Sequence, residues 1–141
     1  MPTFGGRVAP GERLRRLSSH ECKAWLASHH EGRLGYQSGR GPRSVVVSYA
    51  VADDKILVRL PDYNEIVRYA PGAEVSLDVE GGTPAAHREA VTVTGTAELA
   101  ENAHRPLIDK AAFEEDWPPD VRTSIICLPI NAMEGFELRD L

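Results

Sequence analysis

The chain has 141 residues, 42% of them hydrophobic and 26% charged, which describes one soluble globular domain with a core of its own. Its formal net charge of −5 argues against nucleic-acid binding, since nucleic-acid-binding proteins usually present a basic surface. No segment approaches the roughly 18 apolar residues of a membrane span, and two cysteines are too few for a disulfide framework, so we expect a reduced, cytoplasmic protein that binds no membrane.

The N-terminal segment, residues 1–16, differs in charge from the rest of the chain. Its charged residues are Arg7, Glu12, Arg13, Arg15 and Arg16. No apolar run follows these basic residues, so the segment does not have the pattern of a secretory signal. We predict a flexible basic arm over residues 1–16 and one folded domain over residues 17–141.

The stretch LSSHECKAWLASHHEG, residues 17–32, is typical of an amphipathic helix. Ser18 and Glu21 have the spacing of a capping box, in which each side chain accepts a hydrogen bond from the backbone of the other residue. The residues that follow at helical spacing on one face are Cys22, Trp25, Leu26 and His29. Gly32 suits the left-handed turn that ends many helices, so we predict that the helix ends there.

After Gly32 the sequence changes to the alternation that is typical of strands. The β-rich runs lie at residues 33–37, 43–51, 56–60, 73–81, 90–99, 123–129 and 132–138. Short turns separate most of them, and further helices are expected at residues 64–69 and 106–116. Since neighbouring strands joined by short turns pair antiparallel, we predict a mainly β fold, a barrel of about six strands with flanking helices.

Several kinds of chemistry have no motif in this sequence. It contains neither a Walker nor a Gly-rich dinucleotide fingerprint, and no Gly-x-Ser-x-Gly elbow. His29 and His30 are adjacent, so on a helix they point about 100° apart and cannot chelate one ion, and we predict no metal site. Cys22 and Cys127 lie in apolar surroundings, and we expect both thiols to be buried and unreactive.

With this layout the sequence resembles the flavin-binding split-barrel family related to pyridoxamine 5′-phosphate oxidase, in particular its actinobacterial-type branch. The matching stretches are LSSHECKAWLASHHEGRLGY, VVVSYAV with the acidic turn after it, ILVR, AEVSLDVEG, VTVTGTAEL and the Trp-Pro-Pro at residues 117–119. The resemblance implies a six-stranded antiparallel split barrel that forms a homodimer. It also implies FMN or a deazaflavin as the cofactor.

The phosphate-binding motif of that family is degenerate here, in VRLPDYNEIVRYAPG, residues 58–72. Family members have an Arg, a hydroxyl residue, a Gly-rich turn, a Ser or Thr, and a Lys that opens a helix, all groups that suit an anion. The residues at these places are Arg59, Leu60, Tyr63, Asn64 and Glu65. Glu65 would repel a phosphate by roughly 3 kcal/mol at about 5 Å and an effective dielectric near 20. Arg68 could reach the phosphate instead, with Glu65 paired to Arg68 or Arg59.

Two functions remain open on this basis. The first is a flavin-dependent oxidoreductase, in which the chain binds and orients the flavin and the flavin supplies the hydride chemistry. The candidate cofactor ligands are Arg33, Ser48, Tyr49, Arg59, Asn64, Arg68 and Trp117, and no catalytic acid or base is identified. Tyr49 and Trp117 are also explained as core or interface packing. The second function is a homodimer without flavin that binds another small molecule or a protein partner.

Overall fold

The computed structural model describes residues 12–83, 87–101, 104–111, 113, 118, 120–130 and 132–140. In chain order the elements are β1 (Glu12–Arg16), α1 (Ser19–Ser28), β2 (Glu31–Ser38), β3 (Gly41–Ala52), β4 (Lys55–Pro61), α2 (Glu65–Tyr69), β5 (Glu74–Thr83), β6 (His87–Thr96), β7 (Glu98–Leu99), α3 (Arg105–Lys110), β8 (Thr123–Pro129) and β9 (Ala132–Asp140). The strands join in one sheet in the order β1-β9-β6-β5-β2-β3-β4-β8-β7, and each neighbouring pair is antiparallel.

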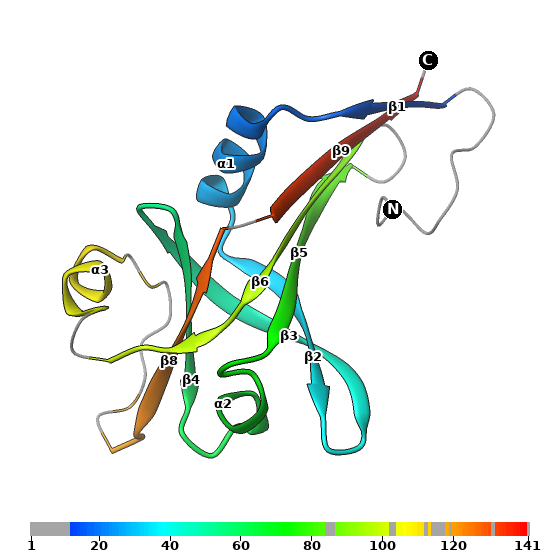
Figure 1. The fold of residues 1–141 in the computed structure, drawn as a ribbon. Coiled ribbons are helices and arrows are strands. Elements are labelled where there is room, and N and C mark those ends of the chain that lie inside the picture. Colours follow the sequence, from blue (N-terminus) through cyan, green and yellow to red (C-terminus); the bar gives the residue numbers. More distant parts are fainter. Residues whose placement is uncertain are drawn as a thin grey trace.

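This sheet curls into a split barrel (Figure 1). The long strand β3 connects its two parts, because residues 41–48 pair with β2 and residues 49–52 pair with β4. Alternate residues of the strands face inward and fill the core. Its fully buried side chains include Leu26, Leu34, Tyr49, Ile56, Leu77 and Ile126. The mainly β split-barrel prediction is therefore confirmed.

The described part of the chain has nine strands, whereas the sequence predicts about six. Two of the additional strands, β1 and β7, lie at the two edges of the sheet. They have five and two residues. A period of two residues is hard to recognise in a segment as short and charged as β1. Residues 98–99 of β7 lie inside the run predicted at residues 90–99, which the structure divides between β6 and β7.

Strand β1 changes the boundary expected for the N-terminal arm. Residues 12–16, assigned to the arm from their charge, pair with β9 along their whole length, from Glu12 opposite Asp140 to Arg16 opposite Phe136. The charged side chains of an exposed edge strand conceal its alternation in the sequence. The rest of the predicted arm, residues 1–11, lies outside the described residues.

Helix α1 begins as predicted and ends earlier. The backbone amide of Glu21 donates to Ser18 Oγ at 3.1 Å and the amide of Ser18 donates to Glu21 Oε1 at 3.0 Å, which confirms the capping box. The helix ends at Ser28, and Gly32 lies in β2 instead of a helix-ending turn. Gly32 is required for packing, because a Cβ at this position would lie 2.9 Å from the carbonyl oxygen of Asp78 in β5.

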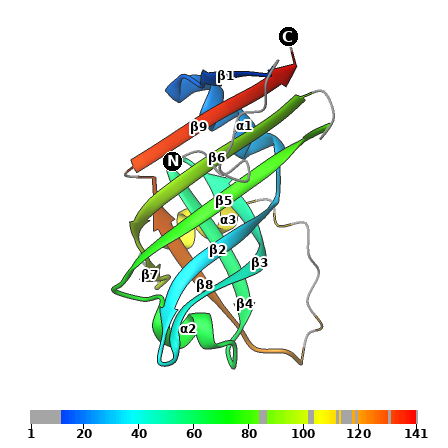
Figure 2. The same cartoon turned by 90° about the vertical axis from the view of Figure 1, so that its right-hand side faces the viewer.

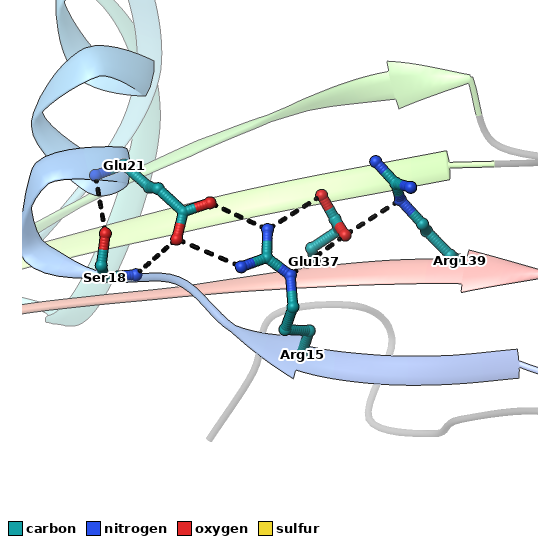
Figure 3. A network of polar contacts seen from close by, with 5 residues as sticks. All are labelled: Arg15, Ser18, Glu21, Glu137 and Arg139. Atoms are coloured by element: carbon teal, nitrogen blue, oxygen red, sulfur yellow. Dashed lines mark hydrogen bonds and ion pairs between the residues drawn. The ribbon is translucent and has the colours of Figure 1, made fainter.

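A polar network ties β1 and α1 to β9 (Figure 3). Arg15 donates through Nη2 to Glu21 Oε2 at 2.8 Å and through Nε to Glu137 Oε1 at 3.3 Å, and Arg139 Nε lies 2.9 Å from the same Glu137 oxygen. Glu137 is only 5% exposed, so its charge needs these partners. The hydrogen bonds from Arg15 and from the Ser18 backbone lower the pKa of Glu21 to about 2.

Two other helices differ in how well the sequence predicts them. Helix α2 matches its expected position, with the side chain of Asn64 accepting from the amide of Ile66 at 2.9 Å as an N-cap. Helix α3 ends at Lys110, where the sequence predicts continuation to residue 116, and Ala111 is already extended. Among the described residues no helix is long and apolar enough to cross a membrane.

Candidate functional site

The predicted cofactor ligands are divided among three surface cavities. The β4–β8 cavity contains Arg59, the β2–β5 cavity contains Arg33, and the hairpin cavity, between the β2–β3 hairpin and α2, contains Asn64 and Arg68. The sequence predicted a single site for these four residues. In one chain the structure therefore brings only Asn64 and Arg68 together.

The β4–β8 cavity has a volume of about 530 Å³ and combines cationic, hydroxyl and apolar groups. It is lined by Arg59, Leu99, Ala100, Arg105, Ile108, Phe113, Thr123, Ser124 and Ile125. Arg59 Nε donates to Thr123 Oγ1 at 3.1 Å, which fixes the guanidinium against β8. Ser124 Oγ donates to Asp62 Oδ1 at 2.5 Å. The Ser124 proton is thus used by a carboxylate, and two guanidiniums with the Thr123 hydroxyl beside an apolar wall can bind an anionic group that is joined to a planar apolar ring.

The hairpin cavity has a volume of about 560 Å³ and contains the altered phosphate motif. It is lined by Ser38, Gly39, Arg40, Arg43, Asp62, Tyr63, Asn64, Glu65, Arg68 and Tyr69. Its walls carry charges of both signs, so it is not simply a phosphate cradle.

Glu65 is held in this cavity by partners that the sequence did not indicate. Its carboxylate accepts a hydrogen bond from the Tyr36 hydroxyl and lies 3.1 Å from Arg43 Nη1, instead of pairing with Arg68 or Arg59. Burial, and after it the hydrogen bond to Glu65, raise the pKa of Tyr36 to about 12. Arg68 lies 5.2 Å from the ring centroid of Tyr69. Glu65, which stands where the family motif has a Lys, is thus held in place by Tyr36 and Arg43.

The β2–β5 cavity is smaller, about 250 Å³, and acidic. It is lined by Glu31, Gly32, Arg33, Val46, Asp78 and Glu80. Arg33 Nη1 donates to Ser44 Oγ at 3.4 Å, and three carboxylates, those of Glu31, Asp78 and Glu80, line the same cavity. Ser48 lies on β3 opposite Glu31. Carboxylates would repel a phosphate here, so this cavity does not suit the anionic end of a nucleotide.

Tyr49 and Trp117 are the two aromatic residues expected near a flavin ring. Tyr49 is 1% exposed and its hydroxyl donates to the carbonyl oxygen of Leu26 at 2.7 Å. Burial raises the pKa of this phenol. Tyr49 is therefore a core residue, as the packing alternative expects. Trp117 lies outside the described residues.

Several residues of these cavities are not indicated by the sequence patterns. Thr123 and Ser124 are more than 60 positions from Arg59 in the sequence, and only the pairing of β4 with β8 brings them close. Arg40 and Arg43 lie in SGRGPR, residues 38–43, whose Gly and Pro residues indicate a turn. Their basic character was a signal that the sequence did contain.

Neither metal chemistry nor thiol chemistry has a candidate in the described ranges. They contain no group of three His, Cys, Asp or Glu side chains that could hold a metal ion. Cys22 and Cys127 are free and buried, and burial raises the pKa of both thiols. Both cysteines are therefore buried as predicted, and their raised pKa disfavours the reactive thiolate.

The fold and cavities are those of an antiparallel split barrel with ligand-sized clefts on its surface. A family model described as pyridoxamine 5′-phosphate oxidase matches residues 18–137, and the chain belongs to this family. No protein with a curated description matches the sequence significantly.

Solved structures of similar fold include two FAD-binding proteins. The one from Mycobacterium smegmatis has a TM-score of 0.75 and 18% identity over 88% of this chain and 98% of its own. The one from Mesorhizobium loti has a TM-score of 0.75 and 22% identity over 92% of this chain and 100% of its own. A FAD- and heme-binding protein from Mycobacterium smegmatis has a TM-score of 0.65 and 10% identity over 92% of this chain and 73% of its own. At these identities the likeness is one of fold.

Proposed function

We propose that the protein binds a flavin nucleotide, FMN or a deazaflavin, with its phosphate at Arg59 in the β4–β8 cavity. The observation that carries this proposal is the donor set of that cavity, Arg59, Arg105 and the hydroxyl group of Thr123 beside an apolar wall. Membership of the family supports it. The names of the FAD-binding relatives support the flavin class and extend the choice to FAD.

The residues of the cavity fit such a cofactor. Arg59 is oriented by Thr123, and in the described part of the chain its two Nη groups have no other partner, so they are available to an anion. Arg105 adds a second positive charge, and its own carboxylate partner Asp109 is exposed and 3.6 Å away. Ile108 and Phe113 offer apolar surface for a ring. The volume lies within the roughly 300–1,000 Å³ of most ligand sites.

We further propose that the protein is an oxidoreductase that works as a cytoplasmic homodimer. A bound flavin supplies hydride transfer, and the chain contributes binding and orientation. Arg59 and Arg105 would hold the anionic end of the cofactor, and Ile108 and Phe113 would offer apolar surface that excludes water from the ring. No acid or base of the chain needs to be assigned for this role.

The test is an absorbance spectrum of the purified protein, followed by thermal-shift titrations with FMN, FAD and a deazaflavin. A ligand at 100 times its dissociation constant should add about 2.7 kcal/mol to the free energy of unfolding. Arg59→Gln should weaken flavin binding at least tenfold, because it removes the charge and the fork of donors. Arg13→Gln, an equal change of charge on β1, is the matched control and should bind as the wild type does. A colourless protein with no thermal shift, or full binding by Arg59→Gln, would contradict the proposal.

The contact of Glu65 favours a second candidate function. Its carboxylate stands where the family has a Lys and is fixed by Tyr36 and Arg43. A split-barrel homodimer without flavin, which binds another small molecule or a protein partner, would not need a Lys at this position to hold a phosphate. A dimer that responds to none of the three flavins would identify this function.

A further inference from the structure

Strand β1 lies at one edge of the sheet, with one side of its backbone directed away from the other strands. It pairs with β9 and with no other strand among the residues that the structure describes. Figure 2 shows β1 beyond β9, at the end of the molecule opposite α2. The amide of Leu17 donates to the carbonyl oxygen of Gly135 at 2.8 Å. Since inward and outward groups alternate along an antiparallel edge strand, the N–H and C=O groups of Leu14 and Arg16 point away from β9.

This edge carries three arginines, of which one is neutralised. Carboxylates of α1 and β9 hold Arg15 (Figure 3). Arg13 and Arg16 are exposed, and within the described ranges neither is in an ion pair. Arg13 also lies opposite Arg139 of β9, and like charges at directly opposite positions destabilise a sheet. A carboxylate placed beside Arg13 would therefore relieve a repulsion that the chain itself leaves in place.

We propose that the edge of β1 is a binding site for a protein partner, which adds an acidic extended segment to the sheet as a further strand. In this mode the main chain of the partner bonds to the outward groups of Leu14 and Arg16, and its side chains determine specificity. Carboxylates of the partner pair with Arg13 and Arg16, and an apolar residue between them covers Leu14, which is 37% exposed. An antiparallel segment that meets these demands has the order acid, any residue, apolar residue, acid.

The charge of β1 selects this occupant over a second copy of the chain. Residues 12–16 contain three arginines and one glutamate, a net charge of +2. Pairing β1 with β1 of another copy would bring two positive strands to about 4.8 Å from each other, whereas an acidic segment is attracted at the same distance. The site is independent of flavin binding, because no residue of β1 lines the β4–β8 cavity.

The experiment is titration of the full chain with a fluorescent peptide, Thr-Glu-Thr-Val-Glu-Thr with blocked ends, followed by fluorescence anisotropy at low and constant ionic strength. Arg13→Glu and Arg16→Glu should each weaken binding at least about threefold, because each replaces an attraction by a repulsion. Arg40→Glu, an equal change of charge on the exposed β2–β3 hairpin, is the matched control and should change binding less than about twofold. Circular dichroism confirms that each variant is folded.

Amide hydrogen exchange, followed by NMR, separates strand addition from attraction between charges alone. With the peptide bound, the amides of Leu14 and Arg16 should exchange at least about tenfold more slowly, because their N–H groups gain acceptors in the new strand. Arg59→Gln should bind the peptide as the wild type does, whether or not flavin binds.

Four results would overturn the proposal. The first is that the peptide does not bind the wild type at millimolar concentration. The second is that Arg40→Glu weakens binding as much as Arg13→Glu, which would show attraction to the whole surface. The third is that the bound peptide leaves the exchange of Leu14 and Arg16 unchanged, which would place it elsewhere. The fourth is that oligothymidylate displaces the peptide at equal concentration, which would show a site for nucleic acid.

Discussion

Replacing Glu137 by Gln should loosen the attachment of β1 and α1 to the sheet. The substitution keeps the shape of the side chain and removes a charge that is 5% exposed and shared by Arg15 and Arg139. Both arginines would lose a carboxylate partner. The NH2 group of the new side chain would also face the N–H groups of the arginines, so that donors would meet donors.

The size of the effect follows from the exposure of the partners. Removing one member of a fully buried ion pair costs about 3–5 kcal/mol. Here the partner side chains are 48% and 61% exposed, and the Arg15 contact is long at 3.3 Å, so water compensates much of the loss. We expect the free energy of unfolding to fall by about 1–2 kcal/mol, with a melting temperature lower by about 3–10 °C.

Urea unfolding and thermal melting measure this change. Glu134→Gln is the matched control, since Glu134 is an exposed carboxylate on the same strand and should change stability by less than about 0.5 kcal/mol. Amide hydrogen exchange in β1 should become faster in Glu137→Gln and stay unchanged in the control. Equal stability of the two variants would refute the role given to the network.

Three further predictions concern pH and packing. The pKa of Tyr36 is raised to about 12, so its contribution to stability is complete below its ordinary pKa of about 10 and is lost as pH rises towards 12; the difference in urea stability between the wild type and Tyr36→Phe should shrink over that range. The pKa of Glu21 is lowered to about 2, so its contribution is present above its ordinary value near 4.5 and is lost as pH falls towards 2; melting curves of Glu21→Gln should lack that part of the acid dependence. Gly135→Ala should destabilise the protein by about 1–3 kcal/mol, because the new Cβ would lie 2.5 Å from Cys22 Sγ, and Cys22→Ala should restore part of the loss in urea unfolding.

Local sequence patterns predict the fold well where a short segment contains its own partners. The capping box of Ser18 and Glu21 and the N-cap at Asn64 depend on residues within three positions of each other. The early end of α1 could not be predicted, because Gly32 serves a contact with β5, over 40 residues away. Helix α3 ends at Lys110, before the end of its pattern, and Leu107, Ala111 and Phe113 pack on residues of β3, β4 and β8. Contacts with strands so distant in the sequence are not visible in the local pattern.

The candidate site is less predictable for the same physical reason. The resemblance to the family points to Arg59, Asn64 and Arg68, but not to the residues that surround them in the fold. The pairing of β4 with β8 decides that Arg59 meets Thr123, and the β2–β3 hairpin decides that Glu65 meets Arg43. Such contacts depend on strand register over long separations, which one sequence does not reveal.

Strand β1 also affects how the molecule behaves towards its own copies. Free strand edges invite other chains to add to a sheet, and arginine side chains along an edge oppose this by mutual repulsion. Here Arg13, Arg15 and Arg16 line the edge, whereas the strand behind it carries Phe136 and the buried Leu138. Deleting residues 12–16 would expose the backbone of β9 beside these apolar residues. We therefore expect the basic strand β1 to protect the domain against aggregation through the edge of β9.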